Sequence, residues 1–193
     1  PTLATPLSVW FTATAILAIV ERDSIPLSGA GYVLAVLSAS FTVMVPFAID
    51  RAVTDRAIAA GVLSTLVFPV AFVAIEFFRA RVMPNATWGS IAYTQYGALS
   101  LMQIAAFAGI WGIIFLMTWS ASTLDLVWHH GLASMTGRTA LLAFGSVFAA
   151  AIAAGTVRVG TTPAERETLR VAALNRPADL FIPGEMTRIT EGR

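Results

Sequence analysis

The chain has 193 residues, of which 57% are hydrophobic and 12% are charged, and its mean hydropathy is +0.77. Soluble domains carry about twice this fraction of charge and disordered chains are far more polar, so both classes are excluded for most of the sequence. The net charge of +1 gives no basic field for nucleic acid. The absence of cysteine excludes disulfides, thiolate zinc sites and cysteine nucleophiles within these residues.

The charged residues are unevenly placed. All twelve basic residues are arginine, and eleven of the charged residues lie in 158–193. This distribution is typical of a polytopic membrane protein followed by a polar segment. We therefore expect a transmembrane helix bundle over 1–157, and a linker with the start of a second domain over 158–193. The beginning at Pro1 and the polar end lead us to expect a piece of a longer protein.

Five apolar stretches approach the length of about 20 residues that a helix needs to cross a bilayer. Buried backbone polar groups must be paired in lipid, and these stretches do not alternate as barrel strands do, so helices are predicted. The fold class is therefore an all-α polytopic membrane helix bundle with about five transmembrane helices. The arginines in the short loops divide evenly between the two sides, so charge does not predict the orientation. The stretches are 3–20, 27–49, 57–78, 101–127 and 139–157.

The sequence changes character after Arg158. Residues 161–167 are polar, contain a proline and are typical of a linker. Residues 169–175 alternate in part between polar and apolar side chains, which predicts the first strand of a truncated α/β domain.

Glu76 is the residue of the third stretch that is most costly to place in lipid, and Arg79 lies three residues after it. An ionised carboxylate in the apolar region costs a few kcal/mol on insertion scales, and a spacing of three residues puts both side chains on one helical face. Two interpretations remain open. The pair could line a substrate cavity, or it could lie at a helix end near the lipid headgroups.

The segment 83–100 is the longest loop between the stretches and is rich in aromatic and hydroxyl side chains. Such a segment can lie at the membrane surface, with its rings on lipid and its polar groups in water. For Gln103 an interhelical hydrogen bond is predicted. Metal binding by His129 and His130 is disfavoured, because adjacent residues do not share a helical face and only Asp125 is at a useful offset.

Four short motifs follow one another along the chain. Residues 75–79 read Ile-Glu-Phe-Phe-Arg, and residues 88–95 read Trp-Gly-Ser-Ile-Ala-Tyr-Thr-Gln. Gln103 precedes residues 109–116, Gly-Ile-Trp-Gly-Ile-Ile-Phe-Leu, and residues 171–174 read Val-Ala-Ala-Leu. This order resembles the apolipoprotein N-acyltransferase family. There, Glu-aromatic-x-Arg, Trp-x-x-x-Gly-Tyr-Ser-Gln and Gln…Gly-x-x-Gly-x-x-Phe-Leu segments precede the first strand of a nitrilase-type domain.

The resemblance implies an enzyme that moves an acyl chain from a phospholipid to the N-terminal amine of a diacylglyceryl-modified lipoprotein. It implies a Glu-Lys-Cys triad, a thioester intermediate, no cofactor or metal, and a place in the bacterial cytoplasmic membrane with residues 83–100 outside the cytoplasm. This chain has no lysine and no cysteine, so no catalytic residue is assigned to it. The residues expected to bind substrate at a lateral opening are Glu76, Arg79, Trp88, Tyr93 and Gln95.

Two alternatives stay open. Asn-Ala-Thr at 85–87 replaces a Gly-x-Pro of the family, and 175–193 has the character of an insertion, so one alternative is a membrane-anchored nitrilase-type amidase or acyltransferase with another acceptor. The other is a non-enzymatic membrane bundle such as a transporter. Paired mid-membrane charges and repeat symmetry between halves would favour the latter, and the sequence shows neither.

Overall fold

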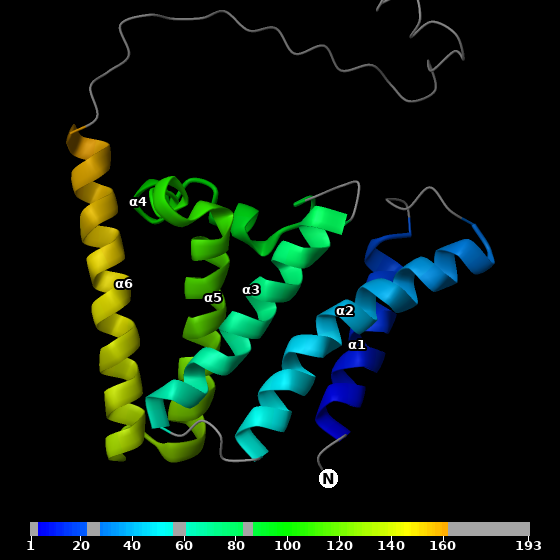
Figure 1. Cartoon of the computed structure of the whole chain (residues 1–193), viewed down its shortest axis with the longest axis horizontal. Helices are drawn as coiled ribbons and strands as arrows, with labels where there is room; N and C mark the ends of the chain where they lie inside the picture. Colours follow the sequence, from blue (N-terminus) through cyan, green and yellow to red (C-terminus); the bar gives the residue numbers. More distant parts are fainter. Residues whose placement is uncertain (1–3, 23–27, 56–60, 83–86, 162–193) are drawn as a thin grey trace, which may run out of the picture. The chain divides into compact units, whose positions relative to one another are not determined.

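The computed structural model describes residues 4–22, 28–55, 61–82 and 87–161, and these form helices joined by short connections. The five long helices run alternately in opposite directions, and η2 and α4 lie at the end where α3 finishes and α5 begins (Figure 1). The elements are α1 (Ala4–Val20), α2 (Ala30–Asp55), η1 (Gly61–Leu63), α3 (Ser64–Val82), η2 (Ile91–Gln95), α4 (Leu99–Met102), α5 (Ala105–His130) and α6 (Met135–Thr161).

Four of the helices are long and apolar enough to cross a membrane, and the prediction of an all-helical bundle is confirmed for the described residues. The four candidate spans are Ala30–Thr54, Gly61–Val82, Ala105–His130 and Met135–Thr161. The first predicted stretch forms α1, which has 17 residues and is shorter than the four spans. The strand predicted at 169–175 lies outside the described residues.

The prediction of one continuous helix over 101–127 is wrong, because the structure divides this stretch. The short helix α4 ends at Met102, and α5 bends at Gly109, whose φ is 61° and ψ is −163°. Only glycine adopts this backbone conformation without strain. Gly112 adds to the need for small residues, because a Cβ there would lie 2.7 Å from both the Ala108 Cβ and the Ile104 Cγ2. Hydrophobicity alone does not reveal such a bend, since a straight helix and a bent helix can both lie in lipid with the same apolar side chains.

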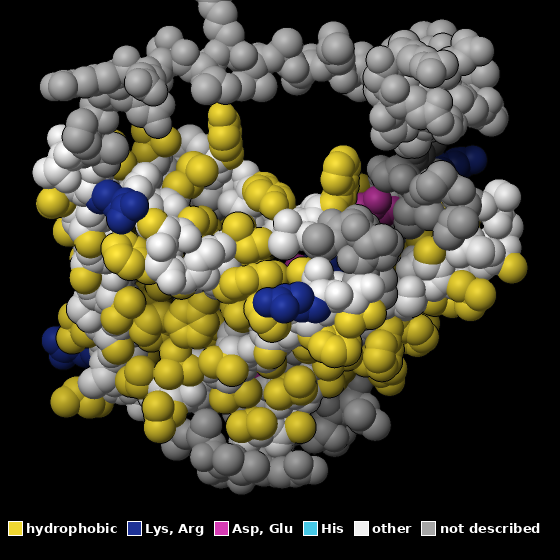
Figure 2. All heavy atoms as spheres, turned by 45° about the horizontal axis from the view of Figure 1, so that its top comes forward, with side chains coloured by type: hydrophobic (Ala, Val, Ile, Leu, Met, Phe, Trp, Pro, Cys, Tyr) yellow, Lys and Arg dark blue, Asp and Glu magenta, His cyan; other side chains and the backbone are white. Residues whose placement is uncertain are grey.

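The surface of the helical unit is apolar. Figure 2 shows hydrophobic side chains over most of the visible sides of the helices, with few charged groups among them. Large side chains that would be buried in a soluble protein are exposed here, for example Phe11, Leu34 and Leu142. A continuous exposed apolar surface of this kind needs lipid or a partner, which agrees with the four candidate spans and makes this a membrane protein.

The interior is built mainly where α3, α5 and α6 meet. Trp119 of α5 contacts the ring of Phe144 edge-on at 5.4 Å between centroids, and its Nε1 donates a hydrogen bond of 2.9 Å to the Thr65 hydroxyl of α3. Two further aromatic side chains, Phe47 of α2 and Phe68 of α3, meet at 4.7 Å between ring centroids. Phe47 follows the buried Pro46 of α2, and Phe68 precedes the buried Pro69 of α3.

The short helix α4 is held against α6. The hydroxyls of Ser100 and Thr156 lie 2.9 Å apart, and a Cβ at Gly155 would collide with the Ser100 carbonyl. Small residues at helix contacts allow this close approach in membranes. The contact fixes α4 over the space between α5 and α6.

Candidate functional site

The Glu76–Arg79 ion pair lies in the last two turns of α3. The Arg79 Nη2 donates to the Glu76 Oε2 at 2.8 Å, and the side chains are 31% and 17% exposed respectively. The pairing expected from the spacing is therefore present. A charge-assisted hydrogen bond of this length offsets part of the cost of placing both charges close to lipid.

Arg79 is only partly satisfied by this bond. Its Nε atom is buried and has no hydrogen-bond partner within the described part of the chain. A buried guanidinium N–H without an acceptor costs free energy, so the bond to Glu76 compensates the burial of Arg79 only in part. Glu76 and Arg79 do not line the cavity described below.

Aromatic contacts fix the end of α3 that carries the pair. Phe77 packs edge-on against Trp111 of α5, with 5.3 Å between ring centroids, and the Arg81 guanidinium lies 4.7 Å from the Phe77 centroid. Trp111 follows the bend at Gly109 by two residues. The bend therefore determines which ring α5 presents to α3 at this level.

The segment from Thr87 to η2 has one face packed on the helices and one face exposed. Ala92 is buried against Ile113 and Ile114 of α5, whereas Trp88 is 79% exposed. The Tyr93 and Thr87 hydroxyls lie 2.8 Å apart. This arrangement suits a segment at a membrane surface, and the binding roles of Trp88 and Tyr93 stay predictions.

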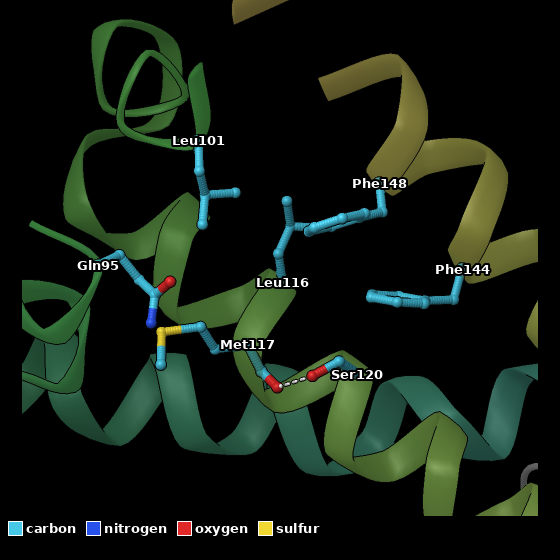
Figure 3. Close-up of a pocket in the computed structure, with 7 residues that line it drawn as sticks. All are labelled: Gln95, Leu101, Leu116, Met117, Ser120, Phe144 and Phe148. Atoms are coloured by element: carbon cyan, nitrogen blue, oxygen red, sulfur yellow. Dashed lines mark hydrogen bonds between the residues drawn. The ribbon is translucent and has the colours of Figure 1, made fainter. Parts of the chain in front are cut away.

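Gln95 occupies a different place, because its carboxamide points into a cavity between α4, α5 and α6 (Figure 3). The cavity has a volume of about 350 Å³, within the range of about 300–1,000 Å³ common for small-molecule sites. Five apolar side chains and two polar ones line it, namely Leu101, Leu116, Met117, Phe144 and Phe148 with Gln95 and Ser120.

The two polar groups of the cavity differ in their hydrogen bonds. The Ser120 hydroxyl donates to the Met117 carbonyl at 2.6 Å, so its donor is satisfied. The Gln95 Nε2 donates to the Thr94 hydroxyl at 3.1 Å. Since an amide has a second N–H and a carbonyl oxygen, Gln95 keeps hydrogen-bonding capacity for a ligand.

The five predicted binding residues thus fall into three groups at the same end of the helices. Glu76 and Arg79 form one pair, Trp88 and Tyr93 lie on the surface segment, and Gln95 lines the cavity. Within the described residues, no hydrogen bond joins one group to another. The sequence analysis missed Leu116, Ser120, Phe144 and Phe148. On each helix the two residues are four positions apart, which places them on one helical face. This spacing does not reveal that the face of α5 and the face of α6 meet.

Two other predictions can be compared with the structure. Within the part of the chain that the structure describes, Gln103 makes no interhelical hydrogen bond, which corrects the prediction: its Nε2 donates to the Leu99 carbonyl four residues earlier. The Nδ1 of His129 lies 3.5 Å from the Asp125 carboxylate, and both side chains are largely exposed. No group of three metal-ligating side chains occurs among the described residues.

Comparisons with known proteins identify the family of the chain. Residues 3–123 match the family described as the apolipoprotein N-acyltransferase N-terminal domain. The chain belongs to the apolipoprotein N-acyltransferase family. One relative, an apolipoprotein N-acyltransferase of Geobacter metallireducens, is 39% identical over 57 residues, which are 30% of this chain and 11% of that protein. No solved structure matches this chain.

In this apolipoprotein N-acyltransferase family member, the matched residues 3–123 include all five predicted binding residues. It ends within α5, so α6 lies outside it. The cavity therefore combines residues from the matched domain, such as Gln95 and Leu116, with Phe144 and Phe148 from beyond it.

Proposed function

We propose that this chain is the membrane-embedded portion of an apolipoprotein N-acyltransferase, an enzyme that transfers an acyl chain from a phospholipid to the N-terminal amine of a lipoprotein. Family membership over 3–123 is the observation that carries the proposal. The four apolar helices give the membrane part that lipid substrates need. The proposed location is the bacterial cytoplasmic membrane.

The covalent steps need residues that these 193 do not contain. In the proposed reaction a cysteine thiolate attacks the phospholipid ester, forms a thioester and releases a lysophospholipid. The lipoprotein amine then attacks the thioester, and the amide product and the free thiol result. Because this chain has no lysine and no cysteine, we assign the Glu-Lys-Cys triad to a nitrilase-type domain supplied by further residues of the protein.

The role of this chain is then to hold and guide lipid. The Glu76–Arg79 pair, the exposed ring of Trp88 and the Gln95 amide all lie at the end of the helices where η2 and α4 lie (Figure 1). Polar and aromatic groups at one end of apolar helices suit the headgroup and ester region of a bilayer. We assign this end to the outer side of the cytoplasmic membrane, with the five residues at the opening for substrates.

The test is complementation by the full-length protein. The gene is expressed in cells depleted of their own acyltransferase, and mass spectrometry of mature lipoproteins measures an amide-linked third chain. We expect the third chain to appear, and to be absent with a full-length variant that lacks the nucleophilic cysteine. A well-expressed protein that adds no third chain would contradict the proposed substrate and favour an amidase or acyltransferase with another acceptor.

A further inference from the structure

Two short helical turns form a strap between two glycines at the η2 end of the helices. The strap consists of residues 98–108, which include α4 and the turn of α5 before the bend. The backbone φ is 98° at Gly97 and 61° at Gly109, so a glycine with positive φ stands at each end. Glycine adopts positive and negative φ about equally well, and a few residues that absorb large φ/ψ changes are enough to make a hinge.

The strap itself is thinly packed. Of its residues only Leu101 is buried, and 105–108 are exposed. The Gln103 amide donates to the Leu99 carbonyl, which is a bond within the strap. Segments with few buried apolar contacts open at a lower free energy than a packed core does. We therefore expect the strap to separate from the bundle more easily than the rest of α5.

A pair of hydroxyl groups joins the strap to α6. The Ser100 and Thr156 hydroxyls lie 2.9 Å apart, and the Thr156 hydroxyl also donates to the Ile152 carbonyl at 2.8 Å. Since a hydroxyl has one proton to donate, Ser100 is the donor of the contact with Thr156. The absence of a side chain at Gly155 lets the Ser100 backbone approach α6 at this point.

Two further contacts hold the strap in place. Leu101 packs with Leu116 and Trp119 of α5, and its side chain points from α4 into the cavity between α4, α5 and α6 (Figure 3). Near the bend, the Arg158 guanidinium of α6 lies 5.5 Å from the centroid of the Phe107 ring. An interhelical hydrogen bond and an exposed cation–π contact are individually weak, so the strap is held by contacts that can break and re-form.

We infer that the strap is a lid, which opens about its two glycines and admits ligands to the cavity from the η2 end of the helices. Opening withdraws Leu101 from the cavity and separates Ser100 from Thr156, and closing restores both contacts. Gln95 precedes the first glycine, so it stays at the cavity when the strap moves. The inference goes beyond the proposed function, because the movement requires no acyl transfer and is measured without turnover.

A disulfide across the hydroxyl contact tests the lid. In the full-length protein in nanodiscs, Ser100→Cys and Thr156→Cys together are oxidised to a bridge that holds the strap closed, since the two side chains already meet. Ser120→Cys places a thiol in the cavity. A hydrophilic maleimide added in water measures access to this thiol, and mass spectrometry separates residue 120 from other cysteines. We expect the bridge to lower the labelling rate at 120 about tenfold, equivalent to roughly 1.4 kcal/mol. Tyr96→Cys, before the first glycine and exposed, should be labelled equally with and without the bridge.

Two threonines of α6 provide a matched pair of variants. Thr156 and Thr139 are both exposed, and each donates to the carbonyl four residues earlier, at 2.8 and 2.9 Å, whereas Thr156 also contacts Ser100 of the strap. Thr156→Val keeps the shape and removes the acceptor of the Ser100 hydroxyl. It should raise the labelling rate of Ser120→Cys about threefold, as expected for loss of an interhelical hydrogen bond in a membrane. Thr139→Val should leave that rate unchanged.

Hydrogen exchange covers the case in which Ser120→Cys does not accumulate. We expect the bridge to slow amide exchange in residues 98–108 and to leave exchange in 112–125 of α5 unchanged. Equal labelling at 120 with and without the bridge would overturn the inference, and so would exchange in 98–108 that the bridge does not slow. Failure of the complementation test together with the expected labelling and exchange would contradict the proposed function alone.

Discussion

The α1–α2 pair and the α3–α5–α6 group are both built from apolar helices, but they are held together by different contacts. In the α3–α5–α6 group large aromatic side chains interlock, as Trp119 does with Phe144. In the α1–α2 pair hydroxyl groups make the specific contacts, since Thr14 donates to Ser40 at 2.8 Å and the Tyr32 hydroxyl donates to the Ala18 carbonyl at 2.7 Å.

This difference shows which region positions the site. Lipid gives little hydrophobic driving force between helices, so packing and a few hydrogen bonds decide where they meet. The ion pair, η2 and the cavity all rest on α3, α5 and α6. The α1–α2 pair reaches this group mainly through α2, where Phe47 meets Phe68. We therefore expect the largest effects of substitution in the aromatic group and the smallest in the hydroxyl pair.

The largest effect is expected for Trp119→Ala, because it removes two ring contacts and the bond to Thr65. The free energy of unfolding should fall by about 3 kcal/mol, the lower part of the range for loss of a buried tryptophan. Titration of the detergent-solubilised protein with SDS measures it. Trp128→Ala is the control on the same helix, since Trp128 is 87% exposed, and equal losses in both variants would contradict the assigned role of the aromatic group.

A smaller loss is expected for Gly155→Ala, because the new Cβ would collide with the Ser100 carbonyl and push α4 away from α6. Overpacking of this kind costs about 1–3 kcal/mol, measured as a lower unfolding midpoint. The control is Gly145→Ala, where nothing lies within 4 Å of the new Cβ. There we expect a gain of about 0.5–1 kcal/mol from helix propensity. A gain at both positions would show that α4 does not rest on Gly155.

Glu76→Gln should have an intermediate effect on stability and a separate one on activity. Loss of the carboxylate leaves the Arg79 charge without its partner, which we expect to cost about 1–2 kcal/mol. Replacing both residues by glutamine should restore most of the stability. Acyl transfer by the full-length protein should stay low in this double variant at normal abundance. Recovery of transfer together with stability would show that the pair serves folding only.

The smallest effect is expected in the α1–α2 pair. Tyr32→Phe removes the hydrogen bond to the Ala18 carbonyl, and interhelical bonds of this kind are worth about 0.6 kcal/mol on average in membranes. Tyr96→Phe is the control, because the Tyr96 side chain is 88% exposed at the surface segment. A loss from Tyr32→Phe as large as that from Trp119→Ala would contradict the contrast between the two regions.

The sequence predicts the helices well and their meeting points poorly. Long apolar stretches can satisfy their backbone in lipid only as helices, and a spacing of three residues was enough to pair Glu76 with Arg79. The bend at Gly109 was missed, because glycine is also common in straight membrane helices. The cavity between α4, α5 and α6 was missed because Leu116 and Phe148 lie on different helices. The contact of Gly155 with Ser100 joins residues far apart in the chain, although Ala151 and Gly155 show the four-residue spacing that permits it.

The central claim is that the helices cross the bilayer and place η2 and α4 on one side, with the α5–α6 turn on the other. Single cysteines test it directly, since the 193 residues contain none. Tyr96→Cys and Ala133→Cys lie at exposed positions at the two ends. With a membrane-impermeant maleimide on spheroplasts, and the labelled peptides identified by mass spectrometry, we expect labelling at 96 in intact spheroplasts and at 133 only after permeabilisation. Labelling of both positions from the same side would contradict the account.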